Sequence, residues 1–137
     1  MRERINDKIK EIKGYVSNLE SYVPSIFEED IGDAKTNDAC EHCFEKIIEA
    51  LADLGFLVVK EKKLREPRDD IDVFSVLLES GVISEELSEK LKNSRRMRNI
   101  IAHEYGSIDN ELVFEAVKNE IGRDAKEFFD KVDEEKR

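Results

Sequence analysis

The residues best suited to chemistry lie close together late in the chain, in the stretch RNIIAHEY. Arg98 supplies a permanent cation, His103 an imidazole that exchanges a proton near neutral pH, and Tyr105 a phenol. A guanidinium can donate two parallel hydrogen bonds to a phosphate, and a histidine can carry a proton to or from a reacting oxygen. Asn99 follows the arginine directly, where its amide could position the arginine or a phosphate, or hydrogen-bond the local backbone. The stretch therefore indicates acid–base chemistry beside an anion.

The charge of the chain reverses sign around this stretch. The whole chain has a formal net charge of -10, whereas residues 90–103 contain five basic residues and no acidic one. A second basic segment, residues 60–68, contains five basic and two acidic residues and includes Glu66-Pro67 near its end. Because the residue before a proline disfavours the helical conformation, we expect this second segment to be an exposed loop. Both segments are candidates for contact with an anion.

The two cysteines suggest a metal or redox site less strongly than their spacing first indicates. Cys40 and Cys43 are spaced as C-x-x-C and flank His42. A structural zinc site uses four ligands, and the chain contains only two histidines. On a helix the two sulfurs would lie one turn apart on the apolar side, so we interpret them as reduced thiols that act as small apolar residues. His42 is then a partly exposed helix residue, and we predict neither a metal nor a cofactor.

The elements that must position these residues are helices. Apolar residues recur at alternating spacings of three and four in five segments, and no segment has the pattern of a strand. Pro24 is expected to end the first helix, Gly81 to close the third, and Ser84 to cap the start of the fourth. The predicted helices span roughly residues 5–23, 39–60, 71–78, 84–105 and 109–132.

These helices predict one all-α domain over residues 1–137, an up-and-down bundle of about five helices. Short connections between successive helices favour antiparallel neighbours. The charged fraction of 41% is well above that of typical globular chains and fits slender amphipathic helices, whose apolar faces a homodimer would help to bury. No apolar run is long enough to span a bilayer, and the N-terminal residues lack the apolar segment of a secretory signal. We therefore expect a cytoplasmic protein with no membrane contact.

The stretch from Arg98 to Tyr105 resembles the R-x-x-x-x-H-x-Y signature of the HepT family of HEPN-domain toxin ribonucleases. The resemblance extends across essentially the full chain: it includes the long second helix, the basic loop, the stretch from Leu87 to Asn99, the following Ile108-Asp109 and the closing amphipathic helix. A bare R-x-x-x-x-H would be a weak signal, since it is short and common. Asn99 directly after the arginine, Tyr105 two residues beyond the histidine and the five-helix context make it more specific.

The resemblance implies a metal-independent RNA endonuclease that forms a homodimer and is the toxin of a toxin–antitoxin pair. In such a protein Arg98 and His103 are catalytic in a cleft between subunits, Asn99 supports them, and Tyr105 accepts AMP from a nucleotidyltransferase antitoxin of the MNT type. A more general role in contacting the RNA backbone or the partner is assigned to Lys92, Arg95 and Arg96, and to Lys62, Lys63 and Arg65 of the second basic segment.

Several alternatives remain open at the level of sequence. His103 could interact with the last carbonyls of its helix, Arg98 could pair with a carboxylate, and Tyr105 could be a bundle aromatic with its hydroxyl at the rim. The basic segments could simply be solvated faces. For the whole protein, the competing interpretation is a non-catalytic HEPN dimer that binds a nucleotidyltransferase or a nucleotide. An acidic helical dimer with no chemistry leaves the stretch without acidic residues unexplained.

Overall fold

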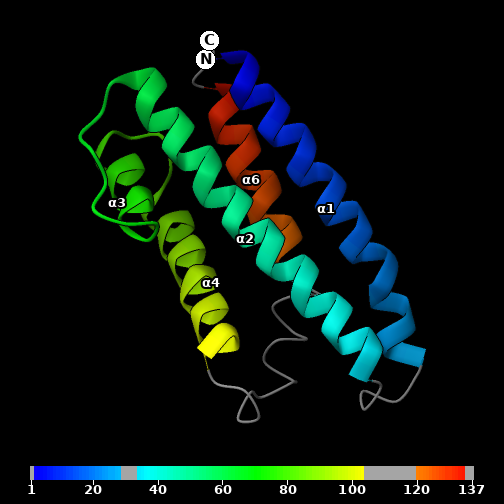
Figure 1. The fold of residues 1–137 in the computed structure, drawn as a ribbon. Helices are drawn as coiled ribbons and strands as arrows, with labels where there is room; N and C mark the ends of the chain where they lie inside the picture. The colour runs from blue at the N-terminus through cyan, green and yellow to red at the C-terminus, as the bar shows by residue number, and fades with distance from the viewer. Residues whose placement is uncertain (1, 29–33, 104–119, 135–137) are drawn as a thin grey trace.

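The computed structural model describes residues 2–28, 34–103 and 120–134, and these residues form helices joined by short connections (Figure 1). The all-α prediction is confirmed, as is the number of five helices within the described ranges. The helices are α1 (Arg2–Glu28), α2 (Ala34–Lys62), α3 (Asp72–Glu79), α4 (Glu85–His103) and α6 (Ile121–Glu134).

Two predicted boundaries were wrong. The first helix does not end at Pro24 but continues to Glu28, and the second begins at Ala34, five residues earlier than expected. A proline removes one backbone hydrogen bond and crowds the preceding turn, yet the residues after it can still adopt helical dihedral angles. The predicted start of the last helix near Asp109 lies outside the described residues.

The long helices run alternately in opposite directions, as the short connections predicted. In Figure 1, α1 descends, α2 returns, α4 descends again and α6 returns, so the two ends of the chain lie near each other. Helix α2 is central, because it contacts all four of the other described helices. The short α3 packs against α2 and α4. The predicted up-and-down arrangement therefore describes the four long helices. The short α3 lies between α2 and α4 in the order along the chain.

The core is formed by the apolar faces of all five described helices. Phe44, Phe74 and Phe128 are almost completely buried, and the rings of Phe74 and Phe128 meet edge to face with centroids 6.2 Å apart. Gly55 allows α3 to approach α2 closely, because a Cβ atom there would lie 3.1 Å from Cγ2 of Val73. The apolar periodicity along the chain thus produces one continuous core.

The predicted glycine cap at the end of α3 and the predicted serine cap at the start of α4 are both confirmed. Gly81 has φ of +81°, and the amides of Gly81 and Val82 donate to the carbonyls of Leu78 and Leu77, which closes α3 in a Schellman arrangement. At the start of α4 the Ser84 hydroxyl accepts a hydrogen bond of 3.1 Å from the amide of Leu87. These two caps set where α4 begins and therefore which residues reach its far end.

Candidate functional site

The structure places the backbone of three predicted site residues at the end of α4. Arg98, Asn99 and His103 occupy the last two turns of this helix, and His103 is its final residue. Their side-chain positions lie outside the described part of the chain, as does all of Tyr105. What the structure establishes for these residues is their register on α4 and the surroundings of the turns that precede them.

The register separates the two candidate catalytic residues. At ~100° per residue, the positions of Arg98 and His103 are about 140° apart around the helix axis. Arg98 shares its face with Leu87 and Leu91, both of which are buried in the core. His103 shares its face with Lys92, Arg96 and Asn99, whose positions span only ~60°. One α4 helix therefore does not present the arginine and the histidine on the same side.

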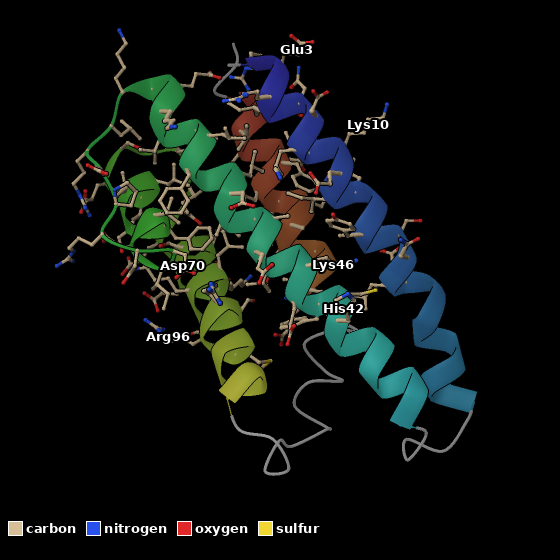
Figure 2. All side chains as sticks on the ribbon, viewed as in Figure 1. Glu3, Lys10, His42, Lys46, Asp70 and Arg96 are labelled. Carbon is tan, nitrogen blue, oxygen red and sulfur yellow. The ribbon has the colours of Figure 1, made fainter. Side chains whose placement is uncertain are left out.

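The basic residues earlier on α4 differ in their partners. Arg95 is 11% exposed and forms an ion pair with Asp70, to which its Nε donates at 2.6 Å, so it joins α4 to the segment that leads into α3. Arg96 is exposed (Figure 2), and its guanidinium donates to the neutral side chain of Asn93 at 2.8 Å. Lys92 is 3.8 Å from Glu89, one turn earlier on the same helix. Arg95 thus has a structural partner on another segment, whereas Arg96 and Lys92 contact only α4 itself in the described interactions.

The second basic segment was expected to be a loop throughout, and its first part is instead helical. Helix α2 continues to Lys62, and Lys63, with φ of 56°, ends it. The amides of Lys63 and Leu64 still donate back to the carbonyls of Lys60 and Val59. The helix thus extends two residues past Lys60 and ends where Lys63 takes a positive φ, three residues before Glu66-Pro67. Lys62 is half-buried and Lys63 is exposed.

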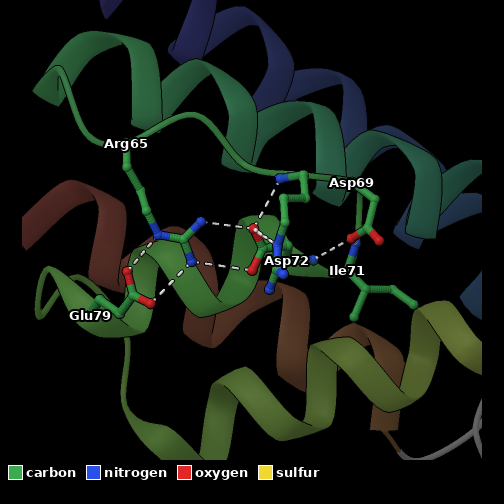
Figure 3. A network of polar contacts seen from close by, with 6 residues as sticks. Arg65, Asp69, Ile71, Asp72 and Glu79 are labelled. Carbon is green, nitrogen blue, oxygen red and sulfur yellow. Dashed lines mark hydrogen bonds and ion pairs between the residues drawn. The ribbon is translucent and has the colours of Figure 1, made fainter.

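Arg65 in this segment forms a network with two carboxylates (Figure 3). Its guanidinium donates to Asp72 at 2.9 Å and to Glu79 at 2.8 Å, and therefore links the segment to both ends of α3. Asp72 is only 8% exposed and also accepts a hydrogen bond of 2.9 Å from the amide of Arg68. The Arg65 guanidinium, together with this amide, holds the pKa of the Asp72 carboxyl well below its usual range. In this structure Arg65 is engaged within the fold.

A surface depression of ≈ 430 Å³ lies between the segment that precedes α3, α3 itself and α4. Cationic side chains line it from both sides: Arg68 from the connection, and Lys92 and Arg96 from α4. Asp69, Asp72 and Ser75 supply its other polar groups. Arg68 was not singled out from the sequence, although it belongs to the second basic segment. Its position opposite α4 is a property of the packing.

A smaller cavity of ≈ 160 Å³ lies on the other side of α4, against α6. It is lined by Lys90, Met97, Arg123 and Asp124, among others. Asp124 is 3% exposed, and burial raises the pKa of its carboxyl group. Sequence reasoning missed this acid. The burial of Asp124 was predictable from the sequence, since this residue lies three positions after Ile121 and four before Phe128, on the apolar face of the helix.

Among the side chains that the structure describes, no group of three or more His, Cys, Asp or Glu residues could hold a metal ion. Cys43 carries a free, half-buried thiol packed against the core, as predicted for a small apolar residue, and burial raises its pKa. His42 is exposed, and the side chain of Cys40 lies outside the described part. None of the helices described is long and apolar enough to cross a membrane.

Comparison with known sequences identifies similar proteins. The model of the family described as "Ribonuclease HepT-like" matches residues 12–132, and this match includes the stretch from Arg98 to Tyr105. The mRNA nuclease HepT of Shewanella oneidensis is 25% identical over 132 residues, which cover 95% of this chain and 96% of that protein. A putative RNase of Archaeoglobus fulgidus is 38% identical over 71 residues. That second alignment covers 52% of this chain and about half (53%) of the relative.

Solved structures with similar folds include components of toxin–antitoxin complexes. A tri-AMPylated Shewanella oneidensis HEPN toxin in complex with an MNT antitoxin has a TM-score of 0.86 at 24% identity, covering 97% of this chain and 98% of that one. A toxin–antitoxin structure with AMP-PNP has a TM-score of 0.84 at 24% identity, covering 94% and 96%. The Bacillus subtilis protein YutE, described as a cytosolic protein of unknown function, has a TM-score of 0.80 at 16% identity, covering 97% and 88%. At these identities the likeness establishes a HEPN-like fold.

Proposed function

This chain belongs to the HepT-like ribonuclease family, and from that premise we propose that it is a metal-independent RNA endonuclease and the toxin of a toxin–antitoxin pair. The observation that carries the proposal is the motif Arg98-x4-His103-x-Tyr105, which lies within the family match. The similar mRNA nuclease of Shewanella oneidensis supports RNA as the substrate class. The location of Arg98 and His103 on the last two turns of α4 is compatible with a site at the end of the bundle.

The chemistry of these residue types suits cleavage through the neighbouring 2'-hydroxyl. In this reaction the 2'-oxygen loses its proton and bonds to phosphorus, and the bond from phosphorus to the 5'-oxygen breaks. The departing 5'-oxygen takes up a proton, so the products are a 2',3'-cyclic phosphate and a 5'-hydroxyl. A histidine suits both proton transfers, because each of its protonation states is populated near neutral pH. An arginine suits the phosphorus centre, because its charge offsets the negative charge that grows there.

A homodimer would supply both a base and an acid. Each chain offers one His103, whereas the reaction is fastest when a group that removes a proton and a group that donates one are present together. A two-fold dimer can place the same residue of both subunits in one cleft. The separation of Arg98 from His103 around α4 supports this arrangement, since the arginine of one subunit could serve a cleft that the histidine of the other also reaches.

Tyr105 is the proposed point of control by an antitoxin of the MNT type. Transfer of AMP to its hydroxyl would add a bulky anion two residues from His103. That anion would block the cleft and repel the phosphates of RNA. The AMPylated HEPN toxin of Shewanella oneidensis, seen in complex with its MNT antitoxin, supports this assignment.

The test is incubation of wild-type protein and His103→Ala with total cellular RNA in the presence of a chelator, followed by analysis of the fragment ends. We expect wild-type fragments that end in 2',3'-cyclic phosphate and none from the variant. His42→Ala is the matched control, because His42 is exposed on α2, and it should cleave like wild type. Absence of histidine-dependent cleavage would instead favour a non-catalytic helical dimer that binds a nucleotidyltransferase or a nucleotide.

Substitution of the tyrosine separates cleavage from control. Tyr105→Phe should retain nuclease activity and resist AMPylation by the antitoxin, because it lacks the acceptor oxygen. Tyr15→Phe is the control, since the Tyr15 hydroxyl lies on α1 and donates to Glu11. Mass spectrometry after incubation with antitoxin and ATP measures the adduct. Unchanged modification of Tyr105→Phe would contradict the assignment of the acceptor.

A further inference from the structure

We propose that Arg68, Lys92 and Arg96 bind phosphodiester groups of an RNA strand and guide the strand along one face of α4 toward His103. This inference rests on the proposed cleavage of RNA and identifies where the uncleaved part of the substrate is held. It also divides the basic residues into those that contact RNA and those that stabilise the fold, a division the sequence does not contain.

The first support is the depression in which the three cations converge. Arg68 reaches it from the connection before α3, and Lys92 and Arg96 reach it from α4. A volume of ≈ 430 Å³ is ample for a phosphate group with part of its sugar. Three cations on two separate segments can contact one phosphate from different sides, which suits a strand lying in the depression better than a flat charged surface does.

The carboxylates that share the depression are already occupied. Asp69 accepts hydrogen bonds from the amides of Ile71 and Asp72, at 3.0 Å and 2.7 Å, in the turn that leads into α3. The carboxylate of Asp72 is buried and accepts one hydrogen bond from each of the two terminal guanidinium nitrogens of Arg65. Arg68 lies 3.6 Å from Asp72 with 84% of its side chain exposed, so it can turn to a ligand while Arg65 continues to neutralise the acid. The two acids therefore oppose an incoming phosphate less than their number suggests.

The same comparison sets aside two basic residues that the sequence grouped with these. Arg65 is paired with Asp72 and Glu79, Arg95 is paired with Asp70, and neither arginine lines the depression. Moving either side chain to RNA would leave a carboxylate without its partner, at a cost in stability. Arg96 differs, since its recorded partner is the neutral amide of Asn93.

The second support is the register of α4. Lys92, Arg96, Asn99 and His103 follow at intervals of four, three and four residues, so their backbone positions lie within ~60° on one face. Arg96 precedes His103 by seven residues, or about 10 Å along the helix axis at ~1.5 Å per residue. Two residues that line the depression, Lys92 and Arg96, and the candidate catalytic histidine therefore follow one another along a single face of α4. An RNA strand that is held in the depression and continues along this face would reach His103.

The third support is electrostatic. A chain with a net charge of -10 repels a polyanion over most of its surface, so RNA contacts must concentrate where cations outnumber uncompensated acids. The face of α4 that carries Lys92 and Arg96 lies within the fourteen residues that contain no acid. Binding there is expected to be local and strongly dependent on salt.

The test measures binding of a fluorescently labelled single-stranded RNA to the His103→Ala protein, so that cleavage does not interfere. Arg68→Gln/Arg96→Gln in this background should weaken binding about tenfold near physiological salt. It should also reduce the slope of log Kd against log salt by about 1.4, or ~0.7 for each lost phosphate contact on a single strand. The control pair Arg4→Gln/Lys10→Gln removes two exposed cations from α1 and should change neither quantity, since Lys10 lies far from Arg96 in Figure 2 and Arg4 is on the same helix as Lys10.

The outcomes separate this inference from the proposed function. If the His103→Ala parent binds RNA and both double variants bind it equally well, the guiding surface is wrong while RNA remains the substrate. If the parent binds no RNA and wild type cleaves none, both proposals fail. If the Arg68→Gln/Arg96→Gln variant binds RNA as tightly as its His103→Ala parent but no longer binds the antitoxin, the inference is overturned in favour of a protein contact. Arg96→Gln alone provides a second reading, since Arg96 is exposed and its loss leaves no buried acid unpaired.

Discussion

Asp72 shows how a single buried acid determines the role of its neighbours. Its carboxylate is 8% exposed and lies at the first residue of α3, where the helix dipole also favours a negative charge. Arg65 supplies two hydrogen bonds to it and two more to Glu79. Because an unpaired buried carboxylate destabilises the folded protein, Arg65 stays paired with Asp72 and is not available to bind a ligand. Arg96, two turns before the end of α4, donates instead to the neutral side chain of Asn93.

At the residue scale, Arg65→Gln should lower the free energy of unfolding at neutral pH. The pKa of Asp72 is depressed in the folded protein, so its stabilising contribution is complete above the ordinary value of 3.8 and is lost as the pH falls below it. The difference between wild type and the variant, measured by urea denaturation, should therefore shrink from pH 7 to pH 3. Arg4→Gln, an exposed α1 control, should differ little from wild type at either pH. A difference for Arg65→Gln that is constant with pH would contradict the role of Asp72.

Helix α4 is the element that positions the candidate site, and its N-terminal half is anchored at several points. Ser84 caps it, the buried Ser88 hydroxyl donates to the carbonyl of Phe74 at 3.1 Å, and Leu87 and Leu91 are buried in the core. Arg95 then ties the middle of the helix to Asp70. These contacts fix the rotation of α4 about its axis. That rotation decides which face the residues of the last turns share.

At the element scale, Ser84→Ala should reduce stability by about 1 kcal/mol, because the amide of Leu87 loses its acceptor. Ser84→Asp should restore most of that loss, since aspartate is an equally good cap. Ser17→Ala, at an exposed position within α1, provides the matched control and should be close to neutral. Thermal and urea denaturation measure all three. Equal effects of Ser17→Ala and Ser84→Ala would show that the cap contributes nothing specific.

For the whole molecule, the antiparallel arrangement places the last turn of α4 at the end of the bundle opposite the chain termini (Figure 1). In the proposed homodimer, two-fold symmetry would bring the His103 of both subunits to a shared cleft at this end. The dimer is proposed because each chain's motif supplies a single histidine, whereas the reaction needs a base and an acid.

At the scale of the assembly, dimers that combine one wild-type and one His103→Ala subunit should cleave far more slowly per dimer than wild type, because one of the two proton-transfer groups is absent. Two different affinity tags allow the mixed dimer to be isolated. A mixed dimer of wild type with His42→Ala should retain wild-type activity. Full activity per dimer in the His103→Ala mixture would contradict a shared cleft.

Features that depend on neighbours along the chain were predictable from the sequence. Apolar periodicity determined the order and type of the described helices, and Gly81 and Ser84 marked real caps, because capping involves residues only a few positions apart. The motif from Arg98 to Tyr105 determined the family, since residue types at set spacings are themselves sequence. The boundary at Pro24 was wrong, because a proline disfavours a helix only in competition with everything else that stabilises it.

Only the tertiary structure decided which charges are engaged within the fold. Arg65 meets Glu79 fourteen residues away, and Arg95 meets Asp70 twenty-five residues away, across packed elements. The convergence of Arg68 with Lys92 and Arg96 likewise depends on how α3 and α4 pack. The sequence determined which residues are basic. Packing determined their partners, because the strength of an ion pair depends on distance and burial, which neighbours along the chain do not specify.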